Sequence, residues 1–263
     1  MRMWAITLLL GVATLCAQGE IVTKTVDYES EGKTCKGFLA YDEQLTAKGK
    51  QPGVLVIHEW WGLNDFTRNK AEALAKLGYV AFAADMYGDG EATTDPARAK
   101  ELASALYGKP LMVERAQASL DQLLKTGLVD EAKVAVIGFC FGGSAAQLLG
   151  YSGAPLKGVV SFHGGLVPAS GDLGTKTQAK FLILSGAEDP SAEPELRDAF
   201  TKSLDEKKIN YQFVLYSDTK HAFMNPMADK VNLPGLGYNA EVAKKAWQQM
   251  QIFFQDLWGD TKS

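Results

Sequence analysis

Short apolar runs alternate with amphipathic segments along most of this chain. The run Val54-Leu55-Val56-Ile57 is continuously apolar, as expected for a parallel strand that is buried on both faces. The segment after it predicts a helix over 65–77, which Asp65 caps and Gly78 ends. The same alternation predicts further strands at 79–84, 133–138, 157–162, 181–185 and 210–216, and helices at 96–107, 111–126, 192–207 and 238–257, with one more helix directly after Cys140.

Two more strands are expected near the start, at 21–28 and 34–41 around the turn 30–33, and the polar stretch 42–51 is expected to be a loop. Alternation of this length predicts an α/β fold, a mostly parallel central sheet with helices on both faces. Such sheets carry their sites in loops at the carboxyl ends of the strands. With 263 residues, 46% of them hydrophobic, the chain can bury one substantial core, so we expect a single domain over 20–263.

The N-terminal segment has a different pattern. Arg2 precedes an apolar run over 4–16, and the small residues Ala17 and Gly19 follow at the two positions that a signal peptidase reads. This is typical of a secretory signal peptide, here 1–19, and predicts an exported protein, periplasmic or extracellular, with no membrane span in its mature form. A membrane anchor is an alternative, but the run is shorter than the roughly 18 residues that span a bilayer. A lipid-modified Cys16 is another, although Leu15 before it fits that processing poorly.

Charge and cysteine content narrow the classes of partner. The formal net charge is −4 and no block of like charge stands out, so nucleic acid and anionic lipid are not expected partners. The chain has no CxxC motif, no clustered His/Cys set and no lysine-bearing phosphate loop, so we expect neither a metal nor a cofactor. Cys35 and Cys140 remain in a compartment where they could form a disulfide.

A candidate nucleophile lies in the segment Gly138-Phe139-Cys140-Phe141-Gly142-Gly143, directly after a predicted strand. This is the G-x-nucleophile-x-G arrangement with cysteine in place of serine. A strand that turns straight into a helix strains the nucleophile's backbone and leaves no room for neighbouring side chains, hence the glycines. The helix N-terminus favours the thiolate. The alternative is an unreactive cysteine buried in a glycine-rich turn.

A nucleophile needs a base, and the base needs an orienting acid. The candidate bases are the three histidines, His58, His163 and His221. In this type of fold the chain order is nucleophile, acid, histidine. Asp189 follows a predicted strand and only His221 comes after it, so this pair is favoured over the rival acids Glu188 and Asp218. The other two histidines are expected to line the core or a pocket.

Acyl transfer also needs hydrogen-bond donors for the oxyanion. The backbone N–H of Phe141, directly after the nucleophile, is one, and the other is expected from the loop 58–62. Two adjacent tryptophans in that loop, Trp60 and Trp61, would shape a pocket; core packing is the alternative for Trp61.

Taken together, these motifs resemble the dienelactone hydrolase family of α/β-hydrolases. The matching segments occur in the family's order between about 21 and 258: His58-Glu59-Trp60-Trp61-Gly62-Leu63-Asn64, Ala84-Asp85-Met86-Tyr87-Gly88, Gly138-Phe139-Cys140-Phe141-Gly142-Gly143, Gly186-Ala187-Glu188-Asp189 and His221-Ala222-Phe223. The resemblance implies an α/β-hydrolase fold, a Cys140–His221–Asp189 triad and an oxyanion hole formed by the amides of Trp60 and Phe141.

The resemblance also implies roles in the substrate pocket. In the family, the glutamate at the position of Glu59 contacts the resting thiol and helps to generate the thiolate when substrate binds; a charge satisfied by a nearby cation is the alternative. The expected pocket residues are Glu59, Trp61, Tyr87 and His163.

Two positions depart from the family pattern. Members that act on dienelactone bind the substrate carboxylate with two arginines, at positions that hold Asp89 and Asn225 here. Substitutes for this clamp could come from Arg68, Arg98 or Arg115. Because an acid at position 89 should repel an anion, we expect a neutral or differently shaped ester.

The expected activity is hydrolysis of a small-molecule ester or lactone through a thioester acyl-enzyme, by a monomer or weak homo-oligomer. One alternative is an exported binding or redox-responsive protein with little turnover. A peptidase or acyltransferase of the same fold is another.

Overall fold

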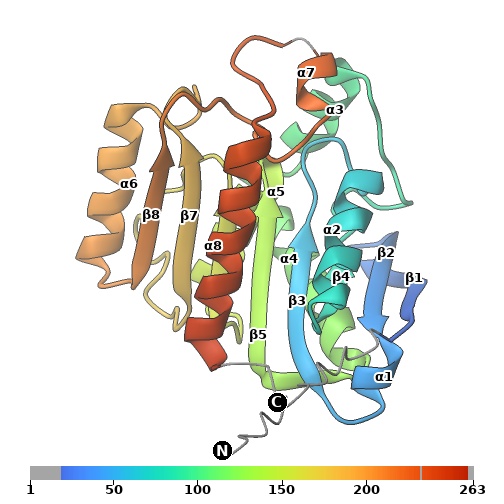
Figure 1. Ribbon diagram of the computed structural model, residues 1–263. Coiled ribbons are helices and arrows are strands. Elements are labelled where there is room, and N and C mark those ends of the chain that lie inside the picture. The colour runs from blue at the N-terminus through green and yellow to red at the C-terminus, as the bar shows by residue number, and fades with distance from the viewer. Residues whose placement is uncertain (1–18, 232, 260–263) are drawn as a thin grey trace, which may run out of the picture.

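The computed structural model describes residues 19–231 and 233–259, so nearly all of the expected signal segment lies outside the described residues. The described chain forms an eight-stranded sheet with helices on both faces, as the alternating pattern predicts (Figure 1). The strand order is β1-β2-β4-β3-β5-β6-β7-β8. No helix among the described residues has the length and apolar character needed to cross a membrane.

The strands are β1 (Ile21–Ser30), β2 (Lys33–Asp42), β3 (Gln51–Ile57), β4 (Val80–Ala83), β5 (Val129–Phe139), β6 (Gly158–Phe162), β7 (Lys180–Gly186) and β8 (Tyr211–Tyr216). The helices are α1 (Glu43–Thr46), α2 (Asp65–Lys76), α3 (Pro96–Ser104), α4 (Leu111–Lys125), α5 (Phe141–Tyr151), α6 (Pro194–Glu206), α7 (Ala228–Val231) and α8 (Ala240–Trp258).

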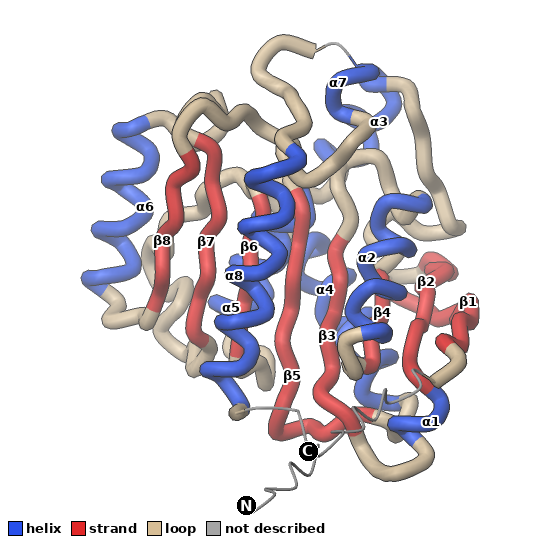
Figure 2. Tube along the Cα trace, viewed as in Figure 1, coloured by secondary structure: helices blue, strands red, loops and turns tan. Residues whose placement is uncertain are grey.

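Strands β3 to β8 pair in parallel, whereas β1 and β2 form an antiparallel hairpin that joins the sheet at β4. The parallel strands therefore share one carboxyl edge, where the loops after β3, β5, β7 and β8 meet. Helices α3 and α7 lie beyond this edge, at the top of Figure 2.

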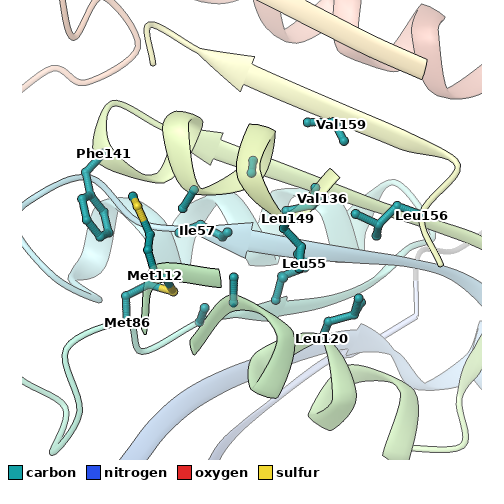
Figure 3. Packing of buried hydrophobic residues seen from close by; sticks show 14 of the residues in the cluster. Leu55, Ile57, Met86, Met112, Leu120, Val136, Phe141, Leu149, Leu156 and Val159 are labelled. Carbon is teal, nitrogen blue, oxygen red and sulfur yellow. The ribbon is translucent and has the colours of Figure 1, made fainter. Parts of the chain in front are cut away.

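The sheet separates two hydrophobic cores. Successive side chains of β3 alternate between them, because neighbouring residues of a strand point to opposite faces. Leu55 and Ile57 pack with residues of α3 to α6 in one core, part of which Figure 3 shows. Val54 and Val56 pack with α2 and α8 in the other. All four side chains are fully buried, which contributes roughly 2 kcal/mol each.

Three local features differ from the sequence prediction. The polar stretch 42–51 contains the one-turn helix α1, which Asp42 caps by accepting a hydrogen bond from the N–H of Leu45. A second one-turn helix, α7, was not predicted either, because four residues give no periodicity to read. Strand β5 starts four residues early, at Val129, and shifts register against β3 between Pro52 and Gly53.

Candidate active site

Cys140 occupies the sharp turn between β5 and α5. Its φ of 52° and ψ of −115° are unusual for a residue with a side chain, and such a conformation costs of order 1–3 kcal/mol. The flanking glycines make the turn possible. A Cβ on Gly138 would lie 1.9 Å from the carbonyl oxygen of Gly142, and one on Gly142 would lie 2.3 Å from that of Ile57. The turn therefore presents a half-buried thiol at a helix N-terminus, next to the end of β3.

His221 and Asp189 form a buried pair beside this turn. The loop after β7 carries Asp189 and the loop after β8 carries His221, and the distance from His221 Nδ1 to Asp189 Oδ2 is 2.7 Å. The Asp189 side chain is fully buried and that of His221 is 12% exposed. The geometry thus joins the two residues that chain order favours.

Cys140 and this imidazole line the same cavity. Burial by itself lowers the pKa of His221, but the neighbouring Cys140 sulfur and the hydrogen bond that the ring donates to Asp189 outweigh it and hold the pKa well above its ordinary value. The cationic form of His221 is therefore favoured beside the Asp189 carboxylate.

Ser191 gives Asp189 a second set of hydrogen bonds, which no sequence motif indicated. Its hydroxyl donates to Asp189 Oδ1 at 2.6 Å, its backbone N–H donates to the same atom at 2.8 Å, and the hydroxyl lies 3.3 Å from His221 Nδ1. Burial raises the pKa of Asp189, but the hydrogen bonds from His221 and Ser191 more than offset it, so the pKa lies below its ordinary value. Asp189 is held ionised.

Glu59 is a buried carboxyl group on the loop after β3, 2% exposed. Burial raises its pKa to about 7, although the side-chain amide of Asn225 donates to Oε2 and His221 and Lys70 contribute positive charge. Lys70 lies over the rings of Phe66 and Trp247 and is another residue that the sequence did not single out. Near neutral pH, Glu59 can therefore both hold and release a proton.

The two amides expected to form an oxyanion hole lie at adjoining loop ends. Within the described residues, the backbone N–H groups of Trp60 and Phe141 make no hydrogen bond. Gly142 packs closely against Ile57, so the start of α5 and the end of β3 lie next to each other. The peptide that carries the Trp60 N–H is held through its carbonyl, that of Glu59, which bonds to Nδ1 of His58. Tyr87 donates its hydroxyl to the carbonyl of Trp60 at 2.9 Å and so holds the next peptide.

The other two histidines are fully buried and make structural hydrogen bonds. Nδ1 of His58 bonds to the Glu59 carbonyl, and Nε2 accepts from the N–H of Met86 at 3.2 Å. Nδ1 of His163 accepts a hydrogen bond from the N–H of Cys140 at 3.2 Å, which stabilises the backbone of the turn. Burial lowers the pKa of His58 to about 4 and that of His163 well below its ordinary value, so both are neutral.

A cavity of about 170 Å³, here called the catalytic cavity, opens beside the thiol. It is lined by Glu59, Trp60, Trp61, Cys140, His221, Ala222, Asn225, Ala228, Val231 and Leu236. Tyr87 and His163 do not line it but contact residues that do. Its walls are mainly apolar and include neither lysine nor arginine.

The candidate substitutes for the arginine clamp lie elsewhere. Arg68 stacks on Phe38, Arg98 pairs with Glu91 and Glu101, and Arg115 donates to Cys35 Sγ at 3.2 Å; these contacts are to residues outside the lining of the catalytic cavity. Asp89 also lies outside that lining and forms an ion pair with Lys33 at 3.2 Å. The structure therefore gives no support to the expectation that Asp89 repels an anionic substrate. The charges that a substrate would meet are those of Glu59 and His221, and neither lysine nor arginine lines the catalytic cavity.

The described cysteines are both free. Cys35 is fully buried on β2, so the disulfide that the sequence left open is not formed. Within residues 19–231 and 233–259, no group of three or more His, Cys, Asp or Glu side chains is arranged to hold a metal ion.

Comparisons with known proteins agree with this architecture. The model of the dienelactone hydrolase family matches residues 36–258. A Saccharolobus solfataricus protein named for carboxymethylenebutenolidase activity is 28% identical over 88% of this chain and 98% of its own length. Protein usf of Aquifex pyrophilus is 30% identical over 88% of this chain and 97% of its own length. The solved structure of a dienelactone hydrolase-like promiscuous phosphotriesterase from metagenomic libraries is 37% identical with a TM-score of 0.86, and the match covers 91% of this chain and 99% of that one.

Proposed function

The chain belongs to the dienelactone hydrolase family, and from this premise we propose that it hydrolyses uncharged carboxylic esters or lactones with Cys140 as nucleophile, His221 as base and Asp189 as orienting acid. One observation carries the proposal: the imidazole of His221 bonds to the buried Asp189 carboxylate and lines the same cavity as the Cys140 thiol, with neither lysine nor arginine in that lining. This is the arrangement that acyl transfer through a thiolate requires.

In the acylation step, the Cys140 thiolate attacks the carbonyl carbon of the substrate. The amides of Trp60 and Phe141 donate to the oxyanion, and each such donor typically lowers the barrier by about 3 kcal/mol. The tetrahedral intermediate collapses to a thioester as the C–O bond breaks, and His221 transfers its proton to the leaving alkoxide.

Deacylation uses the same groups in reverse. Neutral His221 accepts a proton from water, and the hydroxide formed adds to the thioester carbonyl. The C–S bond then breaks, releasing the carboxylic acid and the Cys140 thiolate, and the imidazolium with its partner Asp189 restores the resting charge distribution.

Glu59 supplies a second proton site in this scheme. Its carboxyl lines the catalytic cavity with the thiol, and its pKa of about 7 allows it to accept a proton at neutral pH. In molecules where Cys140 is still protonated when substrate binds, we assign to Glu59 the acceptance of the thiol proton, a role that the resemblance to the family first indicated.

Neutral phosphotriesters are a second candidate substrate class. The relative with the highest identity quoted above is described as a promiscuous phosphotriesterase. A catalytic cavity that is mainly apolar, with no lysine or arginine in its lining, suits a neutral triester better than an anionic lactone. The thiolate would attack phosphorus, expel the alkoxide, and be freed when water cleaves the S–P bond.

A panel of 4-nitrophenyl esters, a neutral lactone, an anionic lactone and a neutral phosphotriester tests the proposal. We expect steady turnover of the neutral substrates by the wild type and none by Cys140→Ala, with Cys140→Ser as the conservative variant. Activity retained in Cys140→Ala would contradict the nucleophile assignment. A stoichiometric burst without turnover would instead favour the binding or redox-responsive alternative.

We further propose that the protein is exported and that cleavage removes about the first 19 residues. The support is the basic, then apolar, then small-residue pattern of 1–19. Mass spectrometry of the protein from its native host should find a mature N-terminus near Glu20, and a chain that starts at Met1 would refute export by cleavage.

A further inference from the structure

A second cavity adjoins the catalytic cavity, and its volume is about 560 Å³. The two share Trp61, Asn225 and Val231 as lining residues. The second cavity is lined in addition by Asn64, Asp65, Phe66, Thr93, Thr94, Pro96, Met227 and Lys230. It lies between the start of α2, the segment that leads into α3, and α7.

We propose that this second cavity binds the distal part of the substrate's acyl chain, and that the enzyme therefore prefers uncharged esters of medium-length acids. This inference rests on the proposed function, because it concerns substrates that Cys140 attacks. It assigns a role to the one-turn helix α7, which forms one wall of both cavities.

Size is the first argument. A cavity of about 150 Å³ holds one benzene molecule, so the catalytic cavity, at about 170 Å³, accommodates little more than the reacting carbonyl and a short substituent. Any longer substrate must continue into a neighbouring space, and the second cavity shares three wall residues with the first.

Direction is the second argument. The leaving group must lie near His221, which protonates it. His221 and Leu236 line the catalytic cavity but not the second one, which opens on the side of Trp61 and Asn225. The acyl chain, not the alcohol, therefore points into the second cavity.

Chemistry is the third argument. The rings of Trp61 and Phe66 and the side chains of Met227 and Val231 give it a largely apolar surface. Its two charged residues have opposite signs, Asp65 and Lys230, and both are exposed. An uncharged chain fits this surface. A chain that ends in a carboxylate would have to give up its hydration, and Lys230, which is exposed, is the only cation in the lining that could compensate for that loss.

The walls are held in place by backbone hydrogen bonds. The N–H of Thr93 donates to the carbonyl of Trp61 at 2.9 Å, and Gly62 forms a β-bridge with Ala92. On the opposite wall, Asn225 Oδ1 accepts from the N–H of Met227 at 2.9 Å. The cavity is therefore preformed, and a chain that enters it gains contact without first ordering a loop.

The test uses 4-nitrophenyl acetate, butyrate and hexanoate, which share one leaving group. We expect kcat/KM of the wild type to rise with chain length, by up to about fourfold for each methylene that enters the cavity. Met227→Trp fills the second cavity, so it should keep acetate hydrolysis within twofold and lose at least tenfold on hexanoate. Ile252→Trp, at an exposed position on α8, is the matched control and should change neither.

Equal kcat/KM for acetate and hexanoate, or an unchanged hexanoate preference in Met227→Trp, would overturn the inference while leaving the proposed function intact. If no ester is hydrolysed, the proposed function fails separately. The inference is then decided by calorimetric binding of butanone and octan-2-one to Cys140→Ala. Tighter binding of the longer ketone, lost on adding Met227→Trp, supports it, and equal affinities contradict it.

Discussion

Asn225 donates a hydrogen bond from Nδ2 to Oε2 of Glu59, and both side chains are buried. Asn225 stands at one of the two positions where the resemblance to the family implies an arginine that binds the substrate carboxylate. An amide donates a hydrogen bond without adding charge, so it compensates only part of the cost of burying a carboxylate. Burial therefore dominates, and it raises the pKa of Glu59 to about 7.

The first prediction is that Glu59→Gln stabilises the protein increasingly as the pH rises. The pKa of Glu59 is raised in the folded state from 4.5 to about 7. The folded state therefore favours the protonated carboxyl. Below pH 4.5 this costs no stability, but the free energy of unfolding falls as the pH rises through 7, by about 3 kcal/mol in total. Glutamine does not titrate and avoids this loss.

Thermal unfolding of the wild type and Glu59→Gln at pH values from 4.5 to 8 measures the effect. The difference in Tm should grow across this range and then level off. Glu131→Gln, at an exposed position, serves as control. A difference in Tm that is the same at pH 4.5 and pH 8 would mean that Glu59 is ionised throughout.

The second prediction concerns substrate charge. Asn225→Arg places a cation in the wall of the catalytic cavity, where no lysine or arginine is present. Because opposite charges attract strongly in a partly buried site, kcat/KM for an ester with a terminal carboxylate should rise at least tenfold relative to a neutral ester of equal length. The neutral control Asn225→Gln should leave this ratio unchanged, and a shift of the same size in both variants would show that side-chain size, not charge, is responsible.

These contacts show what the sequence could and could not predict. Glycines around Cys140 and chain order were sufficient to associate it with Asp189 and His221, because a strand–turn–helix motif and strand-end loops are local signals. The hydrogen bond between Asn225 and Glu59 joins residues 166 positions apart, and only the folded chain reveals it.

Short and irregular elements escaped prediction for a related reason. Helix α1 depends on one cap, in which Asp42 accepts from Leu45, and a single turn leaves no hydrophobic period. Strand β5 extends back to Val129 because β3 offers Gln51 and Pro52 as partners across a register shift. Asp89 was given a role in repelling substrate that its ion pair with Lys33 does not support, because chain position alone does not say where a side chain points.

The third prediction is that Ser191 is a positioning residue for the acid. Its hydroxyl donates to Asp189 Oδ1 at 2.6 Å, and a hydrogen bond to a charged group contributes about 1.5–3 kcal/mol. Ser191→Ala should raise the pKa of Asp189 and lower kcat by about tenfold or more. KM should change little, since Ser191 does not line the catalytic cavity. Steady-state kinetics check this. Ser152→Ala is the control, at an exposed position that caps the C-terminal end of α5 and does not line the catalytic cavity. A loss that appears in KM instead would point to a change in pocket shape.

The fourth prediction is that alkylation distinguishes the two free cysteines and depends on His221. Cys35 is fully buried and burial raises its pKa, so in a chain that begins at Glu20 iodoacetamide should label Cys140 but not Cys35 in the folded protein, and both after denaturation. His221→Gln removes the proposed base beside Cys140 and should slow labelling at pH 7 at least tenfold. Mass spectrometry of the labelled peptides follows both sites in one experiment, and Cys35 provides the internal control. If Cys140 is labelled at the same rate in the wild type and the variant, His221 does not affect the reactivity of the thiol. The assignment of His221 as the base would then be wrong.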